Sequence, residues 1–261
     1  LWRKLWIALA EAEKELGLPI TEGQIAEMKQ YANDINYEDA NAFEREVRHD
    51  VMAHVKAFGK QAKSAEPIIH LGATSCYVTD NAEVMIIDDS LDMVMAKLVN
   101  VMDKLRAFAL RYKDLPTLGF THLQPAQLTT VGKRAALWLS DLKLDYEDLV
   151  HLKSTVRLRG VKGTTGTQAS FLDLFNGDGE KVKELEKRVV SKLGYTAVYG
   201  VTGQTYPRKF DYNVLCVLSQ IAQSAYRFSN DIRLLQHMKE IEEPIEKNQI
   251  GSSAMAYKRN P

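Results

Sequence analysis

The stretch of sequence that decides the fold runs from residue 82 to residue 112 and reads AEVMIIDDSLDMVMAKLVNVMDKLRAFALRY. Its apolar side chains follow alternating steps of three and four residues: Val84, Ile87, Leu91, Val94, Leu98, Val101, Leu105 and Phe108. This spacing is a heptad seam, which is typical of a long helix packed against other helices. Asp80, with Glu83 three residues later, has the pattern of a capping box, so we expect the helix to begin there.

Two further long segments carry apolar residues at near-helical spacing, at about 129–158 and from Pro207 to about residue 240. Three such helices leave apolar stripes that one small subunit cannot cover, so a bundle shared between subunits is expected. The first 70 residues have shorter helical patterns interrupted by Gly and Pro. The predicted fold is therefore all-α, with a small N-terminal helical domain (1–73) and a long-helix bundle domain (74–261). Only residues 195–201 indicate short extended pieces.

Charge and cysteine content argue against a nucleic-acid-binding, membrane-bound or disulfide-rich protein. Lys plus Arg number 34 and Asp plus Glu number 34, so no net field attracts nucleic acid or an anionic membrane. Cys76 and Cys216 are too few for a disulfide framework, and no apolar run of about 20 residues occurs. A reducing, cytoplasmic location is expected. Because the chain starts at Leu1 without an initiator Met and stops at Asn260-Pro261 with no helix-ending or tail-like sequence, we expect it to be truncated at both ends, without its C-terminal domain.

Nearly all the polar chemistry lies in loops between the predicted helices. The segment 160–166, GVKGTTG, lacks the spacing of a nucleotide-binding loop and follows no predicted strand, so a flexible loop near a ligand is the favoured interpretation. The histidines and cysteines show no ligand spacing for a metal apart from His49 and His54, which have no accompanying carboxylate pattern. The sequence implies no metal and no cofactor.

Two loop segments hold groups suited to acid–base chemistry. His122 lies in GFTHLQPAQ (119–127), where it is either a structural histidine or a general acid, since imidazole titrates near neutral pH. The segment 251–261, GSSAMAYKRNP, combines two hydroxyls, a cation and an amide. By composition alone that segment is equally an ordinary polar linker.

The segment 252–261 resembles the signature of the fumarase/aspartase superfamily, Ser-Ser-x-Met-Pro-x-Lys-x-Asn-Pro. Two further regions resemble superfamily motifs in the expected order: GATSCYVTDN (72–81) and GFTHLQPAQ (119–127). Within the superfamily, the first of these regions, Arg48-His49-Asp50, residues 159–168 and Gly203-Gln204-Thr205 are similar to the adenylosuccinate lyase branch, of the animal type. The signature differs at Ala256, where the family usually has proline, so we expect a more flexible loop.

The resemblance implies a β-elimination that releases fumarate from adenylosuccinate, giving AMP, and from succinylated aminoimidazole carboxamide ribotide. It implies that Ser252 is the base and that His122 is the acid that protonates the departing nitrogen. The implied substrate-binding residues are Arg48, His49, Asp50, Thr74, Ser75, Thr121, Gln204, Lys258 and Asn260. It also implies a homotetramer in which three subunits contribute to each site. From the balanced charge, we expect no nucleic-acid or membrane partner.

Three other interpretations remain open. The same chemistry on argininosuccinate is the nearest alternative. A non-catalytic helical scaffold of the same fold is another, although His122, Ser252 and Lys258 argue against it. A coiled-coil interaction protein would account for the heptads but not for the three motif-bearing loops.

Overall fold

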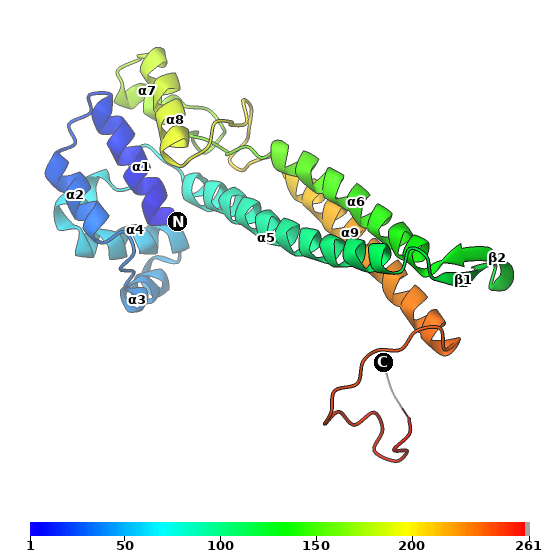
Figure 1. Cartoon of the computed structure of the whole chain (residues 1–261). Coiled ribbons are helices and arrows are strands. Elements are labelled where there is room, and N and C mark those ends of the chain that lie inside the picture. The colour runs from blue at the N-terminus through cyan, green and yellow to red at the C-terminus, as the bar shows by residue number, and fades with distance from the viewer. Residues whose placement is uncertain (259–261) are drawn as a thin grey trace. The chain divides into compact units, whose positions relative to one another are not determined.

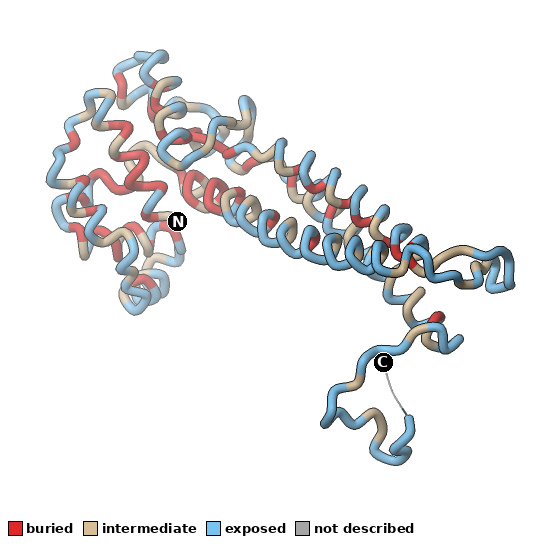
Figure 2. Tube along the Cα trace, in the orientation of Figure 1, coloured by how far each residue is buried: buried red, intermediate tan, exposed pale blue. Residues whose placement is uncertain are grey.

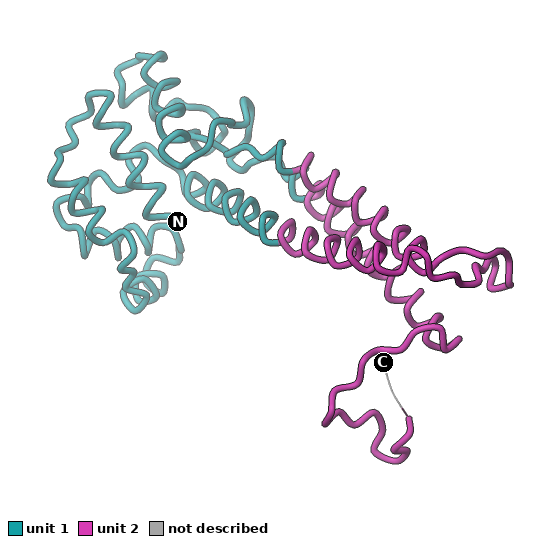
Figure 3. The backbone as a smooth tube through the Cα atoms, in the orientation of Figure 1, with its two compact units in different colours: residues 1–93, 153–211 teal, residues 94–152, 212–261 magenta. Residues whose placement is uncertain are grey.

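The computed structural model describes residues 1–258 and is dominated by helices (Figure 1). The chain forms two compact units, each discontinuous in sequence (Figure 3). Unit 1 consists of residues 1–93 and 153–211, and unit 2 of residues 94–152 with the described part of 212–261. These units are not the domains expected from the sequence, and the domain boundary between residues 73 and 74 stays a prediction.

Unit 1 is a helical body with its own apolar core. Its elements are α1 (Trp2–Glu15), α2 (Glu22–Gln30), α3 (Tyr37–Val47), α4 (Asp50–Gln61), η1 (Lys63–Ile68), the first half of α5 (Ser75–Arg111), α7 (Ala169–Leu174) and α8 (Gly179–Lys192). Trp6, Met28 and Phe58 from three different helices are almost fully buried in one cluster. The start of α2 is defined by a local signal, a capping box between Thr21 and Gln24.

Unit 2 is built from long helices and one β-hairpin. Its elements are the second half of α5, β1 (Pro116–Thr121), β2 (Gln124–Thr130), α6 (Val131–Ser154) and most of α9 (Lys209–His237). Ala135, Trp138 and Leu235 form a small buried cluster between α6 and α9. The Trp138 ring meets Phe228 edge-on at 5.0 Å, and its Nε1 donates to Asp231 Oδ2 at 2.8 Å. Figure 2 shows that buried residues gather in the helices of unit 1 and are interrupted by exposed ones along α5 and α6.

Two sequence-based expectations about element boundaries are wrong. The first long helix begins at Ser75, so Asp80 lies inside it and is buried rather than capping its end. The segment 119–127, expected to be a loop, belongs to the antiparallel hairpin β1–β2, whose register shifts between Leu118 and Phe120. The hairpin has little hydrophobic alternation because most of its residues are exposed, and Pro125 in β2 is unusual within a strand. The extended piece near 195–201 is confirmed by the parallel bridge between Leu158 and Val198.

The base of the hairpin is tightly fitted between α5 and α6. The Val131 N–H donates to the Leu115 carbonyl, and the Gly132 N–H donates to the Tyr112 carbonyl, both at 2.9 Å. The backbone of residue 132 lies so close to the end of α5 that a side chain has no room there. The hairpin therefore leaves the helices at a defined point.

No helix within residues 1–258 is both long enough and apolar enough to cross a bilayer.

Candidate functional site

The residues expected to bind carboxylates begin at the N-terminus of α5. Thr74 directly precedes the helix and is buried, and Ser75 is its first residue. The first N–H groups of a helix lack partners within the helix, and its dipole favours negative charge there. Gln204 reaches this point from the segment before α9, because its Nε2 donates to Thr74 Oγ1 at 3.2 Å. The structure thus brings Thr74, Ser75 and Gln204 together.

Arg48, His49 and Asp50 form the corner between α3 and α4. Arg48 ends α3 in the left-handed conformation (φ 55°), and His49 is the N-cap of α4. The His49 Nδ1 atom accepts from the Met52 N–H at 3.3 Å, as an N-cap side chain does. All three residues are exposed. They offer a cation, an imidazole and a carboxylate on one short stretch of backbone.

His122 lies at the tip of the β-hairpin in unit 2. His122 and Leu123 form the two-residue turn with φ of 51° and 61°, and Thr121, the last residue of β1, pairs with Gln124. Turns with two positive φ values usually contain Asn or Gly, so His-Leu in this turn is strained. His122 also lines a pocket of about 480 Å³, whose other polar lining residues include Lys133, Arg134 and Asp231. Strain of this kind is typical of residues that are held for a function.

Ser252 lies in a turn of the C-terminal segment and is half-buried. Its Oγ accepts the N–H groups of Ala254, at 3.4 Å, and Met255, at 3.2 Å. Two N–H dipoles directed at one hydroxyl oxygen favour negative charge on that oxygen. Lys258 follows in the same segment and is exposed, whereas Asn260 lies outside the described residues.

The expected catalytic pair, His122 and Ser252, is not joined within residues 1–258. No hydrogen bond joins His122 to Ser252 in the part of the chain that the structure describes. The pocket beside His122 is lined by α6, α9 and the hairpin, and Ser252 is not among its lining residues. Local structure orders each group separately. His122 lies in a strained hairpin turn, and the Ser252 Oγ accepts two backbone N–H groups.

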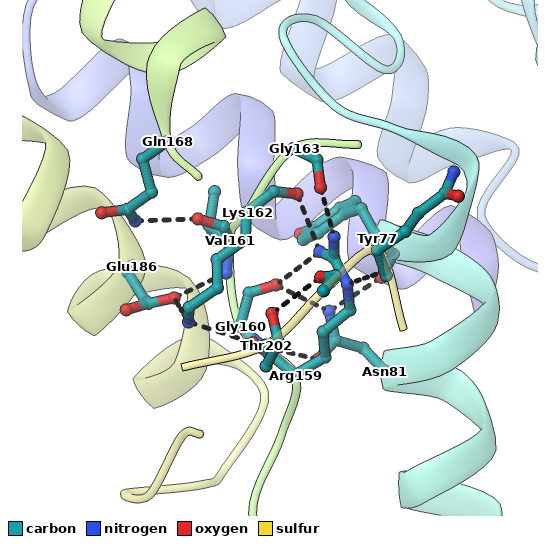
Figure 4. Close-up of polar contacts among 12 residues, drawn as sticks. Tyr77, Asn81, Arg159, Gly160, Val161, Lys162, Gly163, Gln168, Glu186 and Thr202 are labelled. Atoms are coloured by element: carbon teal, nitrogen blue, oxygen red, sulfur yellow. Dashed lines mark hydrogen bonds and ion pairs between the residues drawn. The ribbon is translucent and has the colours of Figure 1, made fainter. Parts of the chain in front are cut away.

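Sequence reasoning missed a buried polar network around Arg159 in unit 1 (Figure 4). Its guanidinium is fully buried and donates to main-chain carbonyls, namely those of Gln204, Gly160, Lys162 and Gly163. Beside it, Lys162 forms a 2.6 Å ion pair with Glu186. Burial lowers the pKa of Arg159, and this effect is opposed by the negative charges of nearby groups that include Asp80 and Glu186.

The loop 160–168 is consequently ordered by many hydrogen bonds, contrary to the expectation of a flexible loop. The Gly160 N–H donates to Asn81 Oδ1 at 3.0 Å, and the Gln168 side chain donates to the Val161 carbonyl at 2.8 Å. An arginine in a Gly- and Thr-rich segment normally indicates a solvated side chain, so composition contained no signal for this network.

Among residues 1–258, no three His, Cys, Asp or Glu side chains are grouped so that they could hold a metal ion.

The chain matches known proteins over its whole length. A family model described as "Lyase" matches residues 2–261. Adenylosuccinate lyase from Saccharomyces cerevisiae is 57% identical over 100% of this chain and 55% of its own length, and that from Schistosoma mansoni is 51% identical with the same coverage. The resemblance to adenylosuccinate lyases is thus confirmed, and the chain spans about 55% of the length of these curated relatives.

Two solved structures share the fold. The fumarate lyase from Mesorhizobium sp. BNC1 superposes with a TM-score of 0.78 at 26% identity, covering 90% of this chain and 54% of that one. The 3-carboxy-cis,cis-muconate lactonizing enzyme from Pseudomonas putida superposes with a TM-score of 0.77 at 26% identity, covering 90% and 52%. The mostly helical fold expected from the sequence is confirmed. The β1–β2 hairpin is a feature that the sequence did not predict.

Proposed function

Because the chain belongs to the lyase family whose pattern spans residues 2–261, we propose that the whole protein releases fumarate from adenylosuccinate and from succinylated aminoimidazole carboxamide ribotide. The observation that carries the proposal is the 57% identity to a curated adenylosuccinate lyase along the entire chain. The first reaction gives AMP, and both are β-eliminations that break a carbon–nitrogen bond. The proposed enzyme is a cofactor-free C–N lyase of purine biosynthesis.

Ser252 is the proposed base that removes a proton from the carbon next to a succinyl carboxylate. A serine hydroxyl is a weak base in water, so it requires an environment that favours its alkoxide. The N–H groups of Ala254 and Met255 supply part of that environment, and Lys258 adds a cation in the same segment. Lys258 and Asn260 would also stabilise the charge that develops on the carboxylate as the proton leaves. Closure of this loop over the substrate would exclude water.

His122 is the proposed acid that protonates the departing nitrogen. Its place at the tip of a hairpin lets the imidazole extend beyond the helices that carry it. Thr121, beside it, offers a hydroxyl to a succinyl carboxylate. Thr74, Ser75 and Gln204 present hydroxyl and amide donors at a helix N-terminus, which suits the other carboxylate. Arg48, His49 and Asp50 are assigned to the nucleotide side of the substrate.

We further propose a homotetramer in which each site takes residues from three subunits. The supporting observation is an apolar groove of about 610 Å³ in unit 2, lined mainly by the heptad seam of α5 and by apolar residues of α6 and α9. An apolar groove along the heptad seam of a long helix is the kind of surface that packs against a further helix. Assembly would also explain why His122 and Ser252 are prepared separately in one chain. A cytoplasmic location is part of the proposal, supported by Cys76 and Cys216, neither of which is in a disulfide.

The proposed function is tested by fumarate release from the full-length protein, followed by ultraviolet absorbance. With adenylosuccinate as substrate, we expect Ser252→Ala and His122→Ala each to lower kcat by about 10²- to 10⁴-fold, the usual contribution of a general base or acid. Ser253→Ala is the matched control and should retain most of the activity. Turnover of argininosuccinate instead of the two purine substrates, or full activity of Ser252→Ala, would refute the proposal.

A further inference from the structure

The main chain that carries Gln204 is held by two buried groups of opposite charge. On one side, Arg159 Nε donates to the Gln204 carbonyl at 2.6 Å. On the other, Asp80 Oδ2 accepts the Tyr206 N–H at 2.7 Å. Arg159 is 0% and Asp80 is 2% exposed, so water competes for neither bond. The peptide groups on both sides of Thr205 are thus fixed by charge-assisted hydrogen bonds, which are among the strong ones in proteins.

A close backbone contact restrains the same segment at a third point. Gly166 has a φ of +80°, and a Cβ atom at this position would lie 1.8 Å from the Thr202 carbonyl oxygen. The loop 160–166 therefore lies directly against residue 202. Arg159 also donates to the Lys162 and Gly163 carbonyls, both at 2.8 Å, so its guanidinium ties this loop and Gln204 together.

Stability alone is a weak reason for a buried arginine in this place. Among residues 1–258, no carboxylate lies within ion-pair distance of the Arg159 guanidinium, whose hydrogen-bond acceptors are neutral carbonyls. Desolvating a charge without a direct counter-ion has a considerable free-energy cost. The arrangement does, however, hold the Gln204 backbone by hydrogen bonds at the peptide groups on both sides of Thr205.

The fixed backbone determines where the Gln204 amide lies. Its Nε2 reaches the buried Thr74 Oγ1 at 3.2 Å, directly before the N-terminus of α5. A primary amide has two N–H donors, so one remains for an anionic ligand after the bond to Thr74 is made. A side chain ordered before binding loses less conformational entropy when the ligand arrives.

We infer that Arg159 and Asp80 are positioning residues that hold the Gln204 amide in place for a carboxylate of the substrate. This inference rests on the proposed function, because it takes the succinyl carboxylate as the ligand of Gln204. Arg159 and Asp80 do not touch the substrate and act only through the segment 204–206. Loss of either residue lets this segment move, and the carboxylate is then bound less tightly.

The test is a double-mutant cycle in the full-length protein with adenylosuccinate as substrate. We expect Arg159→Lys, which cannot reproduce the planar set of donors, to lower kcat/KM about tenfold, mainly by raising KM. In a Gln204→Ala background the same substitution should change kcat/KM less than about twofold, because two residues that act through one contact are not additive. Arg157→Lys, an exposed arginine two residues earlier, is the matched control and should leave kcat/KM unchanged.

Asp80→Asn provides a second variant if Arg159→Lys does not fold. It keeps the size of the side chain while weakening the bond to the Tyr206 N–H, and it should show the same dependence on Gln204. Equal losses in the wild-type and Gln204→Ala backgrounds, accompanied by equal decreases in Tm, would reduce both residues to a structural role and overturn the inference. An inactive wild-type protein would instead overturn the proposed function, and with it this inference.

Discussion

Unit 1 buries a large apolar core, whereas unit 2 buries a small apolar cluster and leaves many apolar side chains of its long helices at the surface. In unit 1, Trp6 and Phe58 are 1% and 0% exposed. In unit 2, Val101, Leu215 and Tyr226 are 48%, 64% and 73% exposed although they lie on long helices. Unit 1 therefore has the packing of an independent core, and the exposed apolar surface of unit 2 is what the proposed assembly of subunits would cover.

The single helix α5 has buried apolar residues in unit 1 and exposed apolar residues in unit 2. Its heptad seam continues without change from Val84 to Phe108. Val84 and Leu91, in unit 1, are almost fully buried, while Val101 and Phe108, in unit 2, are exposed by 48% and 39%. A heptad pattern thus indicates which face of a helix will be covered, but not whether the same chain or another one covers it.

The largest effect is expected from a charge in the groove of unit 2. Val101→Glu places a carboxylate among the apolar side chains that line the groove, and burying it between subunits would be costly. We expect the proposed tetramer to dissociate and fumarate release to fall by at least about 100-fold, because each proposed site needs several subunits. Sedimentation velocity and the activity assay measure the two effects.

Asn100→Glu is the control for this substitution, since Asn100 is exposed on the same helix and does not line the groove. It should leave both assembly and activity intact. A Val101→Glu protein that remained an active tetramer would show that the groove is not a subunit interface.

The second prediction concerns the core of unit 1. Phe58→Ala removes a fully buried ring that packs on Trp6, so the free energy of unfolding should fall by about 3–5 kcal/mol. The folded fraction should keep its number of subunits, because the cavity lies inside the chain. Urea unfolding followed by circular dichroism, together with sedimentation, tests both statements. Phe108→Ala is the matched substitution in unit 2, where we expect weaker assembly and a smaller loss of unfolding free energy.

The smallest of the three effects is a pH dependence that originates in unit 1. Burial raises the pKa of Glu13 to about 9, and neither of its carboxylate oxygens has a hydrogen-bond partner within the described part of the chain. The folded state therefore keeps a proton that the unfolded state loses above a pKa of about 4.5. The stabilising contribution of this protonation is complete below pH 4.5 and is lost as the pH rises toward 9.

Glu13→Gln should remove this dependence. Between pH 6 and pH 8 the wild-type protein should lose on the order of 2 kcal/mol of unfolding free energy that the variant does not lose. Denaturant unfolding at a series of pH values measures the difference. Glu15→Gln, on the surface of the same helix end, is the control and should leave the slope unchanged. Identical slopes for wild type and Glu13→Gln would show that Glu13 is ionised in the folded protein.

The sequence predicted the helices well because their signals are long and periodic. The long helices were expected at 82–112, about 129–158 and 207–240, and they lie at Ser75–Arg111, Val131–Ser154 and Lys209–His237. The error at the start of α5 has a physical cause. Asp80 has the chemistry of a cap, but here the same carboxylate accepts the N–H of Tyr206, 126 residues later in the chain.

The site was less predictable than the helices because its geometry depends on contacts distant in sequence. His122 and Ser252 could be selected from the motifs, and their roles stay predictions. The hairpin turn at His122 lacks the Asn-Gly signal by which such turns are recognised, so its shape was missed. The bond between Gln204 and Thr74 spans 130 residues, and no local pattern contains that pairing.

The missing side chain at Gly132 has an effect at the far end of the hairpin. A Cβ atom there would lie 2.3 Å from the Ala109 carbonyl oxygen and 2.6 Å from the Lys113 Cα. Such a methyl group would force the end of α5 and the start of α6 apart, and the orientation of the two strands would change with them. Since His122 is in the turn at the tip of the hairpin, a small rotation at the base of the hairpin would displace the imidazole by a larger distance. The position of the proposed acid, His122, thus depends on the absence of a side chain at Gly132, ten residues later in the chain.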